Sequence, residues 1–375
     1  MKKIFLGVIT SVLVVSSSLA QKKQTVLSIT QEMHDESWYL EQQKLWSEDL
    51  KKNKKDGDAW YNYYNAVRAL KNISEDETKK ESYRKQCTEI AEDCYKAIPK
   101  SFEANHLMWR DSNNDETKRK YLLEAARIAP NDARAFDDLM IYYEIMRDKE
   151  KFDEMCEKLY QNSELPASLM NWGYNVLSEL EPNAIVFVHG DNDTYALWLT
   201  QSVKGIRKDV TIVNVSLMGM KDYRDRMLKE LGYPEFMGED KEIVEFMVEN
   251  RGEKAIHVSS TAMHGFSETE LADSLYLVGL TYLYCNNQLD NVSLIRRNYE
   301  KRYLLDYLTE QFSVHPSDQI AGLFDALYVP SMIKLYKHYR DSEELSKMKK
   351  MEVLLLKLSK KSGQEERVKE LISNQ

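Results

Sequence analysis

A short polar stretch with two carboxylates follows an apolar run near the middle of the chain. Residues 184–189 are mostly apolar, and the next five residues are Gly190, Asp191, Asn192, Asp193 and Thr194. Paired carboxylates can hold Mg²⁺, which prefers oxygen ligands, and a site of this kind could take a phosphate compound or a glycan. Alternatively, Asp193 or Asn192 is the N-cap of a helix that starts near Thr194 and satisfies its free backbone N–H groups.

Other polar residues are predicted to lie at the same edge of a sheet. The apolar run at 184–189 predicts a buried strand, and the runs at 209–216 and 255–260 predict two more. Ligands of doubly wound sheets bind beside the carboxyl ends of the strands. His189 and His264 are expected to lie close together there, and Ser259, Ser260 and Thr261 end the third strand. The candidate ligand residues are Asp191, Asn192, Asp193, Thr194, Asn214 and Ser216.

No motif assigns a reaction to these residues. The chain contains no P-loop, no Gly-x-Gly-x-x-Gly, no Gly-x-Ser-x-Gly and no His-Glu-x-x-His sequence. It also lacks the Asp-x-Asp-x-Thr loop of haloacid-dehalogenase-like phosphatases, because Thr194 comes one position early. We therefore expect a structural loop, assign no catalytic residue, no metal and no cofactor, and favour a protein that is not an enzyme over an enzyme or ligand-binding domain.

The elements around the candidates predict a small α/β unit. A helical pattern follows the first strand, and two more lie around 222–230 and 241–249. Strands that alternate with helices predict parallel pairing. We expect a Rossmann-like domain over residues 182–290, with a parallel sheet of three or four strands whose fourth strand lies near 280–285.

Helical hairpins are predicted before this unit, over residues 21–181. Apolar residues recur there at offsets of 0, 3, 4 and 7, as in Trp60, Tyr63, Tyr64 and Val67. Pro99, Pro130 and Pro166 are spaced 31 and 36 residues apart. This pattern resembles tetratricopeptide repeats of about 34 residues, which stack to bury their apolar faces. We expect the tryptophans in this region to form the repeat core, with an exposed peptide-binding groove as the alternative.

Helical patterns return over residues 291–375 and predict a C-terminal helical segment. The predicted fold is therefore mainly α with one α/β unit: tetratricopeptide-like hairpins, the small sheet, and the C-terminal helices.

The first twenty residues predict export. Lys2 and Lys3 precede an apolar run at 4–15, and Ser18 and Ala20 are small residues in front of a cleavage point before Gln21. That run and the later apolar stretch at 275–285 are both too short to span a membrane. We therefore expect a cleaved signal peptide at 1–20 and a mature protein in the periplasm without a membrane span.

The chain carries a net negative charge. Removal of the signal peptide with its two lysines changes the net charge from −9 to −11. This balance argues against nucleic acid or anionic lipid as the main partner.

Four cysteines lie in the mature part: Cys87, Cys94, Cys156 and Cys285. Cys87 and Cys94 are two helical turns apart, about 10 Å, which is too far for a disulfide within one helix. Because free cysteines are usually buried, we favour buried thiols. Export still permits a disulfide between distant segments.

A longer stretch, Gly190 to Met218, is similar to the soluble C-terminal region of Bacteroidetes envelope proteins of the protein O-mannosyltransferase-like family. The segments that carry the resemblance are Gly190–Thr194, Leu197–Trp198, Gly205–Val210 and Asn214–Leu217. Those relatives have a multi-spanning membrane half that would hold the glycosyl-transfer site, whereas this chain has predicted helical repeats instead. The resemblance therefore implies an exported accessory or binding protein, and it supplies no catalytic residue.

Three functions are compatible with these patterns. The first is a non-catalytic interaction or scaffold protein that binds protein partners in the bacterial cell envelope through its repeats. The second is a domain that binds a glycan or phosphate compound, or an enzyme acting on one, at the Asp191–Asp193 loop and accessory to envelope glycosylation. The third is a subunit of an envelope complex, such as a secretion or nutrient-uptake assembly.

Overall fold

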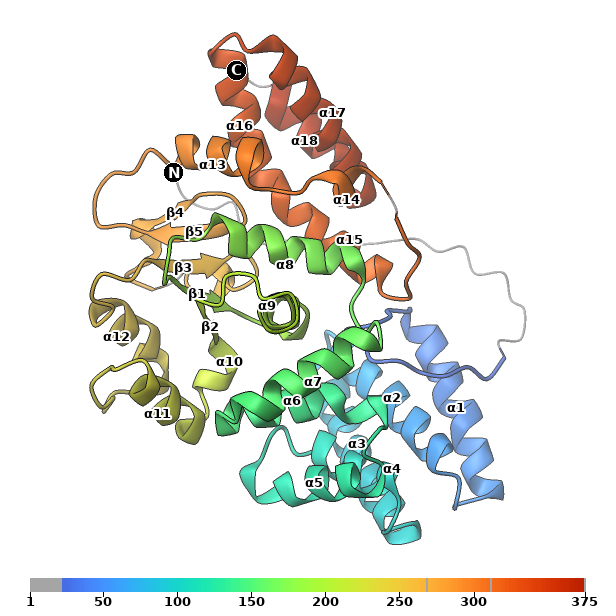
Figure 1. Cartoon of the computed structure of the whole chain (residues 1–375). Helices are drawn as coiled ribbons and strands as arrows, with labels where there is room; N and C mark the ends of the chain where they lie inside the picture. Colours follow the sequence, from blue (N-terminus) through green and yellow to red (C-terminus); the bar gives the residue numbers. More distant parts are fainter. Residues whose placement is uncertain (1–21, 268, 311, 374–375) are drawn as a thin grey trace. The chain divides into compact units, whose positions relative to one another are not determined.

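The computed structural model describes residues 22–267, 269–310 and 312–373. The predicted signal peptide, residues 1–20, lies outside the described residues. The chain divides into two compact units, one up to Leu139 and one from Met140 on (Figure 1). The domain boundaries predicted at residues 181 and 290 stay predictions.

The first unit consists of helices that pack in chain order. They are α1 (Glu36–Lys52), α2 (Gly57–Ile73), α3 (Glu77–Ala97), α4 (Phe102–Arg110) and α5 (Arg119–Ile128), with single 3₁₀ turns at Glu116–Lys118 and Ala133–Ala135. Each helix contacts the next one, and α2 also contacts α4. The contact of α2 with α4 joins one hairpin to the next, as stacked helical hairpins require, because one hairpin cannot bury its own apolar face.

Side-chain caps define where these helices begin. Asp35, Asp56, Asp76 and Ser101 each accept a hydrogen bond from a backbone N–H in the first turn of the helix that follows. Such caps satisfy donors that no residue inside the helix can reach. The predicted tryptophan core is confirmed, since Trp38, Trp46, Trp60 and Trp109 are all buried.

Helix α6 (Phe136–Met146) leads into the second unit, where α7 (Lys149–Gln161) and α8 (Ala167–Glu179) continue the helical pattern. Helix α8 packs closely on α9 (Asp191–Ser202) at Gly173. A Cβ atom at Gly173 would lie 2.7 Å from the carbonyl oxygen of Ala196, so only glycine permits this approach.

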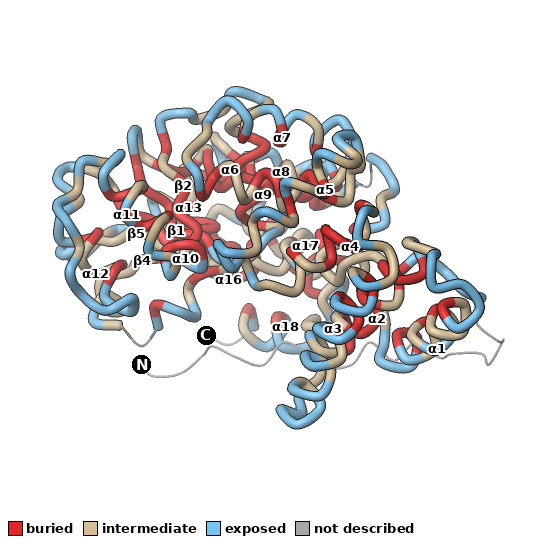
Figure 2. The backbone as a smooth tube through the Cα atoms, turned by 90° about the horizontal axis from the view of Figure 1, so that it is seen from below, coloured by how far each residue is buried: buried red, intermediate tan, exposed pale blue. Residues whose placement is uncertain are grey.

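A five-stranded sheet forms the centre of the second unit. Its strands are β1 (Ile185–Val188), β2 (Thr211–Asn214), β3 (Ile256–Ser259), β4 (Leu275–Leu277) and β5 (Thr281–Tyr284), in the order β2-β1-β3-β5-β4. Strand β1 pairs in parallel with β2 and β3. It is buried along its whole length, as an apolar run covered on both faces must be (Figure 2).

The three predicted parallel strands are confirmed, and the rest of the sheet differs in direction. Strand β5 is the expected fourth strand, but it runs antiparallel to β3 and to β4. Strand β4 was not predicted from the sequence. Only residues 278–280 join β4 to β5, and so short a connection permits a hairpin but no parallel crossover.

The strands are joined by the expected helices and by one that was not expected. Helices α11 (Lys221–Glu230) and α12 (Ile243–Glu249) lie close to the predicted ranges, with a 3₁₀ turn at Asp240–Glu242. The second strand was predicted to run to residue 216, but the short helix α10 (Val215–Met218) begins directly after Asn214. The Asn214 side chain accepts hydrogen bonds from the backbone N–H groups of Ser216 and Leu217, and this cap ends the strand early.

The C-terminal segment is helical, as predicted. It comprises α13 (Asn291–Lys301), α14 (Asp306–Thr309), α15 (Asp318–Asp325), α16 (Val329–Asp341), α17 (Leu345–Lys361) and α18 (Glu365–Ser373). Helices α16, α17 and α18 pack in succession.

Across residues 22–267, 269–310 and 312–373, no helix combines the length and the apolar character that a membrane crossing needs.

Candidate functional site

The predicted cap of α9 is wrong. The helix begins at Asp191, its N-cap is Gly190, and no side chain caps it. Gly190 has φ +97° and ψ 176°, a conformation that side-chain-bearing residues rarely adopt. Only His189 and Gly190 separate β1 from α9, so Asn192 and Asp193 lie inside the first helical turn rather than in front of it.

Asp193 is buried and doubly hydrogen-bonded. Its Oδ2 accepts hydrogen bonds from the backbone N–H of His189 at 2.9 Å and from the hydroxyl of Thr261 at 2.5 Å. Only 2% of Asp193 is exposed. Burial raises the pKa of this carboxyl to about 7, although its hydrogen bonds favour the ionised form. A carboxyl with such a pKa is suited to proton transfer near neutral pH, but a substrate cannot reach it in this conformation.

Thr194 and Asn214 are used to hold the loop together. The Thr194 hydroxyl donates to the carbonyl of Gly190 at 2.5 Å, and the Asn214 amide donates to the Thr194 hydroxyl at 2.9 Å. Both side chains are buried. The structure therefore joins three of the candidate residues, Asp193, Thr194 and Asn214, in contacts that tie β1, α9 and β2 to each other.

The other three candidates lie nearer the surface. Asp191 is exposed and Asn192 is half-buried, both in the first turn of α9, where the helix N-terminus favours negative charge. Ser216 is exposed in α10. Within the described ranges, no group of three or more His, Cys, Asp and Glu side chains is arranged to hold a metal ion.

Two exposed histidines meet beside this loop. The ring centroids of His189 and His264 are 4.8 Å apart, which confirms the predicted proximity. Partial desolvation and the neighbouring His264 lower the pKa of His189. Thr261 links the histidines to the buried carboxyl, because its backbone carbonyl lies 3.3 Å from Nδ1 of His264. The sequence pattern placed Thr261 at the end of the third strand but did not identify it as the partner of Asp193.

The Gly205–Val210 segment of the family resemblance has a structural role at the end of α8. The guanidinium of Arg207 donates hydrogen bonds to the carbonyls of Leu177, Leu180 and Glu181 at 2.7–2.8 Å. The same group pairs with Asp209, which accepts a hydrogen bond from the backbone N–H of Asn183. The C-terminal carbonyls of a helix lack partners within the helix and carry partial negative charge, so a cation is stabilising there.

A second candidate site lies in the first unit, where an extended segment of the chain is held by side-chain amides. The backbone N–H of Val26 donates to Asn62 at 2.7 Å, and the carbonyl of Val26 accepts from Asn65 at 2.7 Å. Gln42 accepts from the N–H of Gln24 and donates to the carbonyl of Lys22. The indole N–H of Trp46 donates to the carbonyl of Gln24 at 2.9 Å.

A buried polar network supports this amide-bearing face. Arg110 donates to the side-chain oxygen of Asn65 at 2.8 Å and to the hydroxyl of Tyr61 at 3.1 Å. The Tyr61 hydroxyl lies 3.2 Å from Nδ1 of His106, whose Nε2 lies 2.8 Å from Asp138. Burial lowers the pKa of His106, so a neutral imidazole accepts from Tyr61 and donates to Asp138. The network fixes which way the Asn65 amide points, since its oxygen faces Arg110 and its nitrogen faces Val26.

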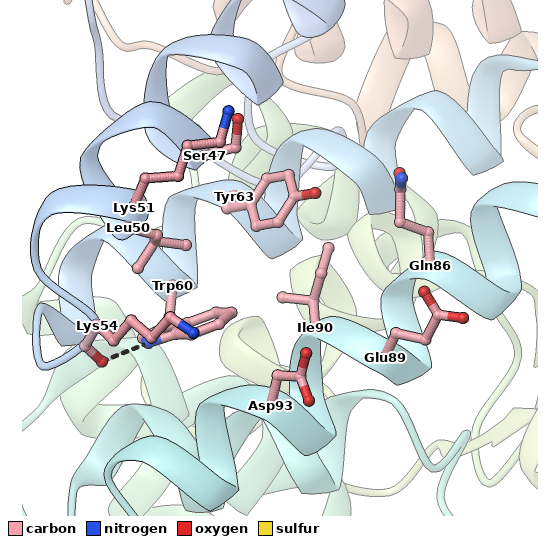
Figure 3. A pocket seen from close by; sticks show the side chains of 10 residues that line it. All are labelled: Ser47, Leu50, Lys51, Lys54, Trp60, Tyr63, Gln86, Glu89, Ile90 and Asp93. Atoms are coloured by element: carbon pink, nitrogen blue, oxygen red, sulfur yellow. Dashed lines mark hydrogen bonds between the residues drawn. The ribbon is translucent and has the colours of Figure 1, made fainter.

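A small pocket opens on another face of the same helices. Figure 3 shows Trp60 and Tyr63 of α2 facing Glu89, Ile90 and Asp93 of α3, and the indole N–H of Trp60 bonded to the carbonyl of Lys54. The pocket volume is about 230 Å³, below the usual range for small-molecule sites. Lys51 and Lys54 line it together with Glu89 and Asp93, so its charge selects neither anions nor cations.

The sequence pattern marked Trp46 only as one of the tryptophans of the repeat core or of an exposed groove, and it did not identify the other residues of the second candidate site: Val26, Gln42, Asn62 and Asn65. A usable signal was the pair Asn62 and Asn65, one helical turn apart and therefore on one face of a mostly apolar helix. Buried amides in such a helix must find partners, and the partner in this fold is backbone from a distant segment.

Comparison with known proteins identifies one related region. A comparison with curated proteins finds no match. Among solved structures, the crystal structure of yeast Tom70 is similar over 90% of this chain with 10% sequence identity and a TM-score of 0.26, and the match spans 58% of the Tom70 chain. The model of the family described as TMEM260-associated domain 2 matches residues 169–234, which include the whole Gly190–Met218 stretch of the family resemblance.

Proposed function

We propose that this chain is an exported, non-catalytic interaction protein of the bacterial cell envelope, which binds protein partners through the helices of its first unit. The observation that carries this proposal is the face of α1 and α2 on which Gln42, Trp46, Asn62 and Asn65 already hold the backbone of an extended polypeptide segment. Contacts to backbone depend little on sequence, so the same face can accept the backbone of another protein.

The second unit has a different part in this proposal. The match to the TMEM260-associated domain and the resemblance to protein O-mannosyltransferase-like envelope proteins support a role accessory to envelope glycosylation. The buried state of Asp193 and the structural contacts of Thr194 and Asn214 favour a non-catalytic role for this unit. Export is supported by the basic start and short apolar run of residues 1–20.

A second candidate function places a glycan or phosphate compound at the α9 N-terminus. The observation that favours it is the pair of exposed histidines beside the exposed Asp191. In this alternative the ligand would contact His189, His264 and the first turn of α9. The buried Asp193 would not contact the ligand and would only hold the loop in place.

Co-purification from the native envelope, followed by mass spectrometry, separates the two functions. We expect a partner protein to be retained by the wild-type chain and by Asp191→Asn/Asp193→Asn. We expect it to be lost from Asn62→Ala/Asn65→Ala. Asn287→Ala, an exposed change in the second unit, is the matched control. Loss of the partner from the aspartate variant alone would move the function to the α9 loop.

A further inference from the structure

We infer that residues 22–26 occupy a docking site for extended peptides, and that this site binds a partner segment with a basic residue three positions before a small β-branched residue. The inference rests on the proposed function, because it names the kind of segment that the first unit takes. The site is formed by Gln42, Trp46 and Asp49 of α1 and by Asn62 and Asn65 of α2.

The backbone contacts have the periodicity of an extended strand. Lys22, Gln24 and Val26 each give backbone groups to the helices, whereas no such contact involves the residues between them. An extended chain presents alternate residues to the same side. All of the donors and acceptors on the helices are side chains, so the site does not depend on pairing with a strand of its own.

Two side chains of the segment give the site its selectivity. Val26 is 1% exposed and belongs to the same buried cluster as Trp38, Trp46 and Leu50. The ammonium of Lys23 pairs with Asp49 and lies 4.4 Å from the ring centroid of Trp46. A carboxylate and an aromatic face together favour a cation. Thr25, between these two positions, is exposed, so the site does not select the side chain at this position.

The two asparagine amides of the site keep their orientation independently of the segment. Arg110 holds the oxygen of Asn65, and the Asn62 amide donates to the carbonyl of Asp58 within α2. Both amides are thus oriented by groups outside the segment, and a preorganised site loses less entropy when it binds. The occupant is therefore exchangeable, and residues 22–26 act as a competitor within the same chain.

The test uses a fluorescent synthetic peptide that copies residues 22–29, with binding measured by anisotropy. The proteins are the full chain, Val26→Asp, which expels the segment from the core, and Thr25→Asp, which adds the same charge at an exposed position. We expect the peptide to bind Val26→Asp at least tenfold more tightly than the wild type or Thr25→Asp. Binding should be lost when Asn62→Ala/Asn65→Ala is added or when the peptide carries Asp at the valine position, and a peptide with Glu for Lys23 should bind more weakly.

A second variant keeps the test decisive if Val26→Asp does not fold. Gln24→Pro changes an exposed side chain and removes the N–H that bonds to Gln42, so it weakens the segment without charging the core. Failure of the peptide to bind either folded variant, or equal binding to all proteins, would overturn the inference. A wild-type dimer that Val26→Asp abolishes would also overturn it, by assigning the site to a second copy of the chain. If the peptide does not bind but a partner co-purifies and is lost in Asn62→Ala/Asn65→Ala, the inference is overturned and the proposed function stands. If the peptide binds but no such partner co-purifies, the peptide site stands and the proposed function is overturned.

Discussion

The hydroxyl of Thr261, just beyond β3, donates a hydrogen bond to the carboxyl of Asp193 in the first turn of α9. This contact crosses between two elements that are 68 residues apart and fixes the loop that the sequence offers as a ligand site. The backbone N–H of His189 bonds to the same oxygen atom. The carboxyl thus serves to join the ends of β1 and β3 to the start of α9.

The buried Asp193 is predicted to make stability depend on pH. Burial raises its folded-state pKa from an ordinary 3.8 to about 7, so its stabilising effect is complete below about pH 4 and is lost as the pH rises through 7. The whole difference corresponds to on the order of 4 kcal/mol, of which about 3 kcal/mol is lost between pH 5 and pH 8. Urea unfolding of the wild type and Asp193→Asn at pH 5 and pH 8 measures it, and the variant should gain stability relative to the wild type at the higher pH.

Asp191→Asn is the matched control for this measurement, because Asp191 is exposed in the same helical turn. Its stability relative to the wild type should change little between pH 5 and pH 8. The assigned role of Asp193 would be contradicted if, for both variants, the difference in free energy of unfolding from the wild type were the same at pH 5 and at pH 8.

Divalent cations are predicted to leave the melting temperature unchanged. Asp193 already has two hydrogen-bond donors, and Asp191 lies at the positive end of α9, so an ion is not required to relieve repulsion. A cation at 100 times its dissociation constant would add about 2.7 kcal/mol of stability. Thermal melts with and without millimolar Mg²⁺, Ca²⁺ or Mn²⁺ should coincide. A rise seen in the wild type but absent from Asp191→Asn/Asp193→Asn would instead identify an ion site.

Arg207 is predicted to stabilise the end of α8 in a way that lysine cannot reproduce. Its planar group reaches three carbonyls at once, whereas an ammonium cannot span them. We expect Arg207→Lys to lower the free energy of unfolding by about 1.5–3 kcal/mol, the usual range for hydrogen bonds to a charged group. Lys208→Ala, next in the chain and exposed, should cost well under 1 kcal/mol, as most surface changes do. If the two changes lowered the free energy of unfolding equally in denaturant melts, a capping role for Arg207 would be contradicted.

The cysteines are predicted to differ in reactivity. Cys87, Cys94 and Cys156 are free and buried, and burial raises the pKa of each thiol to about 12. Because the thiolate is the nucleophile, these three should resist alkylation until the protein unfolds. Cys285 is free and half-buried, and it should react first. Mass spectrometry after iodoacetamide treatment of the native protein shows the order, and early labelling of Cys156 would contradict it.

Local patterns predicted most of the fold. Short continuous apolar runs located the three parallel strands, because a strand covered on both faces is apolar along its length, and the 3.6-residue period located the repeat helices, because each of them buries one face. Strand β4 was missed, since it is only three residues long, and its pairing is set by the tight turn that follows it rather than by its own composition.

The candidate site was predicted only in part. Position at the strand ends correctly brought His189 close to His264 and placed Thr261 nearby. The mistaken cap came from the composition of residues 190–194, which fits a side-chain cap as well as it fits a glycine with positive φ. The amide-bearing face on α1 and α2 could not be predicted, because its amides are recognised as a backbone-binding site only through their contact with Val26, which lies 36 residues from Asn62.

Photo-crosslinking in the native envelope tests the protein-binding role of the first unit most directly. A photoreactive amino acid in place of Asp58 would lie on the same face of α2 as Asn62 and Asn65, at a side chain that is 76% exposed. The same amino acid in place of Asn287, exposed in the second unit, is the control. We expect a discrete adduct with another protein from position 58 and none from position 287. Adducts from position 287 alone, or from neither position, would contradict a protein-binding role for the first unit.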